Sequence, residues 1–199
     1  MSDNKVCELV CTRLSHDIIG NIGAVANAVE LLEEGDMDFI DDIKSILKTS
    51  STNMAARLKF FRMAFGLENP NLEDEKIVKD IAQNYLLTLG NKDFPIRLSF
   101  EIGSVSLRKS ALLAVMIMAD IMLRGGILDV GEQNGKVVAQ ISIDTKISED
   151  KLGKIADAIA SEANISDAVL APVSMLLAMW GKDKILVGKD SDYIRLIVG

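Results

Sequence analysis

Apolar side chains recur every three or four residues through the first 66 positions, in two runs that no proline interrupts. This spacing predicts two long amphipathic helices and argues against strands. The first run covers residues 6–32 and the second covers residues 39–65, with Gly35 and Asp36 between them. Glycine commonly ends a helix, and so short a connection makes the two helices antiparallel neighbours. We therefore expect residues 1–66 to form an antiparallel helical hairpin.

A hairpin of only two helices leaves apolar side chains uncovered. Each helix has a second, weakly apolar side, which carries Leu9, Ile19 and Leu31 on the first helix. The second helix carries Phe60 and Met63 on the corresponding side. Two hairpins from two chains would cover these sides in a four-helix bundle. We therefore expect a homodimer built on the hairpin.

The rest of the chain alternates between helix and strand patterns. A linker at 67–73 contains Pro70 between two asparagines, which break regular structure. After it, the apolar spacing predicts helices at 74–89, 107–123, 148–162 and 172–180, and strands at 95–102, 136–145, 184–187 and 193–198. We expect residues 74–199 to fold as an α/β sandwich, so the whole chain belongs to the α+β class.

Composition limits the partners and the location. The chain has 22 basic and 29 acidic residues, a net charge of −7. Nucleic acids and anionic membranes attract a basic excess, so neither is expected as a partner. The longest apolar run, 111–119, is far shorter than the roughly 20 residues of a membrane-spanning helix. Cys7 and Cys11 form no disulfide framework, which favours the cytoplasm, and with a single histidine they are too few to bind a metal.

His16 is the only histidine in the chain, and Asp17 follows it. His16 lies about 160° from the apolar stripe of its helix, so it should face solvent or a partner. Thr12, Gly20 and Gly23 share its face. Glycine inside a helix costs roughly 1 kcal/mol relative to alanine, so the two glycines need a reason. Close approach of a partner's backbone and tight packing within the bundle both remain open.

A histidine in this position suits phosphoryl transfer. Neutral imidazole is nucleophilic near neutral pH, and its attack on phosphorus places positive charge on the ring. Asp17 can accept a hydrogen bond from the other ring nitrogen and stabilise that charge. The hairpin brings Arg57 to the height of His16, and Arg13 lies one helical turn away. Each guanidinium could steady a transferring phosphoryl group or pack its stem against the apolar stripe.

The segment 9–35 reads LVCTRLSHDIIGNIGAVANAVELLEEG. It resembles the phosphoacceptor helix of histidine kinases and, more closely, that of the ChpT-like histidine phosphotransferases of alphaproteobacterial phosphorelays. The shared residues are Leu9, Arg13, Leu14, His16, Asp17, Gly23, Ala24, Asn27, Glu30, Leu31, Leu32 and Glu33. The segments RLKFFRMAFG at 57–66 and LRGG at 123–126 also fit this family, and the resemblance extends over essentially the whole chain.

The resemblance implies that His16 is the phosphoacceptor and that Asp17 is its acidic neighbour. It implies a homodimer that takes a phosphoryl group from the receiver domain of a hybrid kinase and passes it to receiver domains of response regulators, with Mg²⁺ supplied by the receiver. Gly20 stands where histidine kinases carry a residue for phosphatase work, which makes hydrolysis doubtful. The expected docking surface comprises Leu9, Thr12, Arg13, Ile19, Gly20, Gly23, Arg57 and Phe60. Burial of Leu9 and Ile19 in the dimer bundle is the alternative.

The resemblance also implies that the C-terminal domain is like a degenerate kinase ATP-binding domain. The helix SALLAVMIMADIMLRGG has no asparagine to hold Mg²⁺, and Asp120 is its only carboxylate. The D-x-G sequence at 129–131 lacks the second glycine of a nucleotide box and favours a turn. We therefore expect no ATP binding, which disfavours an ATP-using kinase. A non-catalytic dimeric scaffold that binds receiver domains or a kinase, with His16 incidental, remains the rival interpretation.

Overall fold

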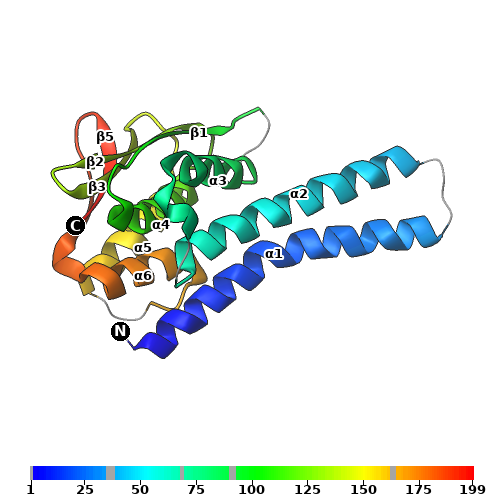
Figure 1. The fold of residues 1–199 in the computed structure, drawn as a ribbon, viewed down its shortest axis with the longest axis horizontal. Coiled ribbons are helices and arrows are strands. Elements are labelled where there is room, and N and C mark those ends of the chain that lie inside the picture. The colour runs from blue at the N-terminus through cyan, green and yellow to red at the C-terminus, as the bar shows by residue number, and fades with distance from the viewer. Residues whose placement is uncertain (1, 35–38, 68–69, 90–92, 162–164) are drawn as a thin grey trace.

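The computed structural model describes residues 2–34, 39–67, 70–89, 93–161 and 165–199. Two long helices, α1 (Asp3–Glu33) and α2 (Ile40–Phe65), run antiparallel and project from a body of sheet and helices (Figure 1). The predicted hairpin is therefore confirmed, although the turn expected at 35–36 lies outside the described residues. Gly66 follows directly after α2, as expected. Across the described ranges, no helix combines the length and the apolar character that a bilayer crossing demands.

The body begins with a short 3-10 helix, η2 (Pro70–Glu73), inside the predicted linker. Asp74 then caps α3 (Glu75–Leu87), accepting hydrogen bonds from the backbone N–H groups of Lys76 and Ile77. The remaining elements are β1 (Ile96–Glu101), α4 (Val105–Ile121), β2 (Gly126–Gln133), β3 (Lys136–Ser142), α5 (Glu149–Ser161), η3 (Ala168–Leu170), α6 (Ala171–Trp180), η4 (Lys182–Lys184), β4 (Ile185–Lys189) and β5 (Tyr193–Val198).

The five strands form one mixed sheet in the order β1-β2-β3-β5-β4. The β1 and β2 strands are parallel, and the other pairs are antiparallel. Side chains alternate along β1, where Ile96, Leu98 and Phe100 are buried and their neighbours are not. The buried face of the sheet packs against α4, whose side chains are almost all buried, and α3 and α5 cover the sheet beside it. The chain is therefore α+β, with helices layered on a sheet.

Strand β2 corrects one prediction from the sequence. The segment at 129–131, which the sequence favoured as a turn, lies within β2 and pairs with both β1 and β3. Only Leu128 and Val130 of this strand are buried, and its glycines and acidic residues interrupt the alternation that would have revealed it. The strand forms because its backbone completes the ladders of two neighbours, which no local pattern expresses.

The base of the hairpin shares one hydrophobic core with the body. Leu9 on α1 and Phe60 on α2 belong to the same buried cluster as α4 and the sheet. The ring of Phe60 stacks on that of Tyr85 from α3, with centroids 4.0 Å apart. Farther along the hairpin, apolar side chains of the predicted stripes remain exposed in the single chain, including Ile22, Val29, Leu32, Phe39, Ile46 and Leu58.

Candidate functional site

His16 projects from α1 into solvent, with its side chain 82% exposed. Its Nδ1 lies 3.4 Å from Oδ1 of Asp17, which is long for a hydrogen bond but places the carboxylate beside the ring. Asp17 itself is only 11% exposed. Because Nδ1 faces Asp17, Nε2 is the ring nitrogen left available to an incoming group. The predicted exposure of His16 is therefore confirmed.

Asp17 is held by a buried arginine. Arg13 Nε donates to Asp17 Oδ2 at 2.7 Å, one helical turn away on α1. The two terminal nitrogens of Arg13 donate to Oδ2 and Oδ1 of Asp120 on α4, at 2.7 and 2.8 Å. Arg13 is 4% exposed. We refer to these three side chains as the Asp17–Arg13–Asp120 network.

The electrostatics of the network follow from burial and pairing. Burial lowers the pKa of Arg13, but the hydrogen bonds and charge of Asp120 outweigh that effect, so the pKa of Arg13 is raised overall. Burial raises the pKa of the Asp120 carboxyl, and the hydrogen bonds and charge of Arg13 oppose this rise. The guanidinium therefore remains charged between two carboxylates.

Arg57 fixes the main chain of the site. Its Nη1 donates to the carbonyl oxygen of Asp17 at 2.5 Å, and its Nε and Nη2 donate to Oγ1 and the carbonyl oxygen of Thr88 at 3.0 and 3.1 Å. Thr88 is the C-cap of α3, where a cation is favourable. The prediction that Arg57 lies at the height of His16 is confirmed. Each of its three nitrogens donates within the chain, and its predicted use as a partner contact stays a prediction.

Three residues of the predicted docking surface are buried and unavailable to a partner. Leu9 and Phe60 are 3% and 0% exposed, and Arg13 is buried in its network. The expectation that Leu9 and Phe60 face a partner is wrong because the body covers the base of the hairpin. That part of the surface was inferred from the hairpin alone, without the helices that pack on it.

The remaining predicted residues lie on the surface of α1 with His16. Thr12, Ile19, Gly20 and Gly23 are all exposed. A Cβ atom added to Gly20 or Gly23 would meet no atom within 4 Å, apart from the helix's own backbone. Packing in the single chain therefore does not require either glycine. We call these four residues and His16 the His16 face.

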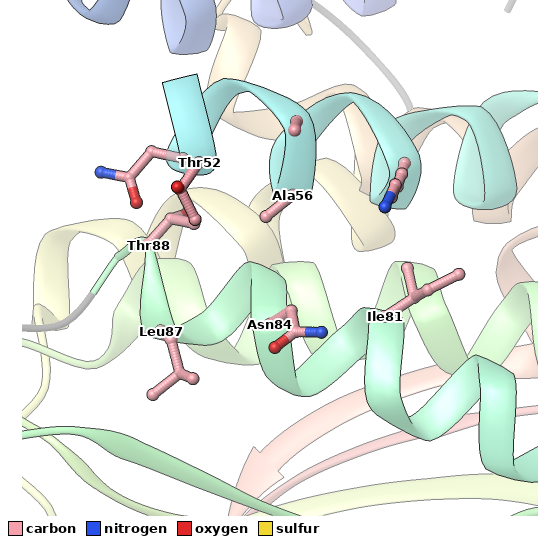
Figure 2. A pocket seen from close by; sticks show the side chains of 9 residues that line it. Thr52, Ala56, Ile81, Asn84, Leu87 and Thr88 are labelled. Atoms are coloured by element: carbon pink, nitrogen blue, oxygen red, sulfur yellow. The ribbon is translucent and has the colours of Figure 1, made fainter. Parts of the chain in front are cut away.

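A cavity of about 400 Å³ opens between α2 and α3, near the site. Figure 2 shows Ala56 on α2 and Ile81 on α3 directed into the space between the helices, with Thr52 and Thr88 at one end. Its other lining residues are Asn53, Ala55, Lys59, Asn84 and Leu87. Thr88, which accepts from Arg57, connects the cavity wall to the main chain of the site. In the described ranges, no group of three or more His, Cys, Asp or Glu side chains is arranged to hold a metal ion.

Asp120 is the site residue that sequence reasoning missed. The sequence marks it only as the single carboxylate of its helix. That isolation was itself a signal, because a carboxylate among apolar neighbours needs a cation or several donors when buried. What the sequence did not reveal is the partner, since Arg13 lies 107 positions away.

Comparison with known proteins points to phosphotransferases. No protein-family model matches the chain. The chain is similar to the protein phosphotransferase ChpT of Brucella abortus (strain 2308), with 50% identity over 58 residues. This match spans 29% of the chain and only 27% of that protein. A solved structure of a bacterial phosphotransferase superposes with a TM-score of 0.76 at 26% identity, covering 100% of this chain and 98% of the other. The predicted resemblance of the chain to ChpT-like histidine phosphotransferases is therefore confirmed.

Proposed function

We propose that this protein is a histidine phosphotransferase that relays phosphoryl groups between receiver-domain aspartates through His16. The observation that carries the proposal is the exposed imidazole of His16 with Nδ1 beside a carboxylate that is itself fixed. The likeness to two phosphotransferases supports it. A bacterial relay of this kind would place the protein in the cytoplasm.

The transfer step uses the ring as a nucleophile. Nε2 of His16 attacks the phosphorus of an aspartyl phosphate, the N–P bond forms, and the bond from phosphorus to the aspartate oxygen breaks. The receiver's carboxylate leaves with the bonding electrons. Asp17 accepts the hydrogen bond from Nδ1–H and stabilises the positive charge that develops on the ring. Attack by a second receiver's aspartate reverses these bond changes and returns the imidazole.

The chain needs to supply little beyond this imidazole. Phosphoryl transfer depends mainly on positioning and on stabilisation of charge. The receiver domain brings its own aspartate and Mg²⁺, so no cofactor bound to this chain is required. We infer that the body corresponds to a kinase ATP-binding domain that has lost ATP binding. It therefore takes part in no ATP-dependent step.

The proposed partners meet the chain at two places. Receiver domains dock on the His16 face, where Ile19 offers an exposed apolar side chain and Gly20 and Gly23 allow close approach. A second copy of the chain covers the exposed apolar residues farther along the hairpin and completes a four-helix bundle.

The test is transfer of labelled phosphate. The purified chain is mixed with a phosphorylated hybrid-kinase receiver domain and Mg²⁺, and the label on the chain is tested for acid lability and base stability. We expect such a label on the wild type and none on His16→Ala, whose exposed side chain contributes little to folding. Binding of several receivers without any label would favour the non-catalytic scaffold.

A further inference from the structure

The buried end of the Asp17–Arg13–Asp120 network has no part in the transfer step described above. Asp120 comes from α4 in the centre of the body, and its side chain is 10% exposed. It accepts from both terminal nitrogens of Arg13, while Lys151 of α5 donates to its main-chain oxygen at 2.9 Å. A rigid, buried carboxylate is thus attached to the residue that holds Asp17.

We propose that Asp120 is a positioning residue for phosphotransfer, because its hold on both terminal nitrogens of Arg13 keeps Oδ1 of Asp17 free for His16. The proposal rests on the proposed function. Asp120 touches neither the imidazole nor any reacting atom. It acts through Arg13, whose Nε alone remains for Oδ2 of Asp17.

Without Asp120, Arg13 could form both of its paired hydrogen bonds with Asp17. A guanidinium favours two parallel hydrogen bonds to one carboxylate. Arg13 and Asp17 are four residues apart on one helix, the spacing at which such side chains meet. Without Asp120, the terminal nitrogens of Arg13 would be free to take Oδ1 of Asp17 as well. That oxygen is the one that faces Nδ1 of His16.

Because the site is buried, competition between Arg13 and His16 for Oδ1 of Asp17 affects the geometry of the site. Arg13 and Asp17 have side chains only 5% and 11% exposed, so water cannot readily replace a lost partner. Arg57 holds the carbonyl oxygen of Asp17, which limits how far the backbone can adjust. The structure shows the side chain of Asp17 turned to His16, and the proposal adds a second arrangement, shared fully with Arg13, that loss of Asp120 would populate.

The setting of Asp17 selects the tautomer of His16. Neutral imidazole carries its proton on Nδ1 or on Nε2, and the hydrogen bond made by one nitrogen decides which. Oδ1 of Asp17 favours the proton on Nδ1, which leaves the lone pair of Nε2 for attack on phosphorus. Loss of this acceptor would populate the other tautomer, in which Nε2 is protonated and not nucleophilic.

The experiment uses the fact that the chain has one histidine. Labelling histidine with ¹⁵N gives ring signals that belong only to His16, and their shifts at alkaline pH report the tautomer ratio. We expect mainly the Nδ1–H form in the wild type and a shift toward the Nε2–H form in Asp120→Asn. We also expect the rate of transfer from a saturating phosphorylated receiver to fall about tenfold, the lower end of the range known for partners that orient metal-bound histidines, with unchanged receiver affinity.

The matched control is Asp129→Asn, which removes a carboxylate of β2 that contacts Gln140 and lies outside the network. It should leave the tautomer ratio and the transfer rate as in the wild type. A folded Asp120→Asn with the wild-type ratio and rate would overturn the proposal. Should that variant not fold, Asp120→Ser takes its place, because a serine hydroxyl is too short to hold both terminal nitrogens of Arg13 and leaves the guanidinium in place. An unchanged tautomer ratio in Asp120→Ser would equally overturn the proposal.

The two readouts separate this proposal from the proposed function. Absence of any label on the wild-type chain would defeat the relay itself. The tautomer ratio is measured without a receiver, so it tests the action of Asp120 on His16 in either case.

Discussion

Arg13 and Asp120 lie 107 residues apart in the chain and meet in the interior through hydrogen bonds of 2.7 and 2.8 Å. The pair joins α1, which carries His16, to α4, the most deeply buried helix of the body. A buried pair of this kind adds little net stability by itself, but removal of one partner leaves the other charge without compensation. The stability of the fold and the geometry of the site therefore share one contact.

Arg13→Met should destabilise the protein by about 3–5 kcal/mol near neutral pH, because it leaves a buried carboxylate unpaired. Burial already raises the pKa of Asp120, and Arg13 opposes that rise. Without Arg13 the native state would bind a proton more tightly than the unfolded state, so stability should increase as pH falls from neutral toward about 4. Urea unfolding across this pH range measures the effect.

Arg97→Met, at an exposed position on β1, is the control and should change stability by less than about 0.5 kcal/mol. An Arg13→Met variant that is as stable as the wild type, or whose stability responds to acidification no differently from that of the wild type, would contradict this interpretation of the pair.

Much of the fold could be predicted because the spacing of apolar residues within each segment indicates its secondary structure. The spacing of apolar residues located α1 and α2, and the alternation at 96, 98 and 100 located β1. Strand β2 could not be predicted from the sequence because only two of its side chains are buried. Its place between β1 and β3 depends on backbone pairing across the chain, which a single sequence does not express.

The site could be predicted in part for the same reason. His16, Asp17 and the approach of Arg57 follow from helix geometry and the register of a hairpin. The burial of Phe60 depends on α3, which supplies Tyr85 as its stacking partner. The partnership of Arg13 with Asp120 likewise depends on how the body packs on the hairpin. Long-range packing of this sort has no local signature.

The glycines of the His16 face give a test of partner approach. Gly20→Ala and Gly23→Ala should each stabilise the single chain by about 0.5–1 kcal/mol, since alanine favours helix and nothing in the chain obstructs its Cβ. Each should also slow transfer from a receiver, because the added methyl group keeps the partner's backbone away. Thermal unfolding and transfer rates measure the two effects.

These variants also distinguish the two explanations for the glycines. Slower transfer with an unchanged oligomeric state assigns the glycines to receiver docking. Loss of self-association would assign them to the bundle, and wild-type values for both would contradict the claim that a partner approaches here.

The apolar residues along the outer hairpin predict self-association. Ile22 and Val29 are 53% and 42% exposed in the single chain, so burial in a bundle would stabilise it. Light scattering should give the mass of a dimer at micromolar concentration, and Ile22→Asp with Val29→Asp should give a monomer. Ile127→Asp, on the open face of the sheet, is the matched control and should remain a dimer. A monomeric wild type would contradict the prediction.

Tyr85 gives a test of the core beneath the site. Its hydroxyl is buried and, within the described part of the chain, has no hydrogen-bond partner. Tyr85→Phe should therefore keep the stability of the wild type or raise it by about 1 kcal/mol. A loss of more than about 1 kcal/mol would show that the hydroxyl is satisfied in solution.

The same residue predicts the behaviour of the fold at high pH. Burial, followed by the charge of Asp120, raises the pKa of Tyr85 above its ordinary value. The native state thus keeps the proton after the unfolded state begins to lose it, so this stabilising contribution is present below about pH 10 and is lost above it. Denaturant unfolding at alkaline pH should show a shallower loss in Tyr85→Phe than in the wild type. Tyr193→Phe, at the exposed second tyrosine, should retain the wild-type slope.

We propose that phosphoryl groups pass through His16, and a relay between two receiver domains measures this passage. A labelled hybrid-kinase receiver is mixed with an unlabelled response-regulator receiver, with and without this chain, and the label on the second receiver is followed over time. We expect label to reach the second receiver only when the wild-type chain is present, and His16→Ala to be inactive. Label that reaches the second receiver equally well with His16→Ala would show that His16 does not carry the phosphoryl group.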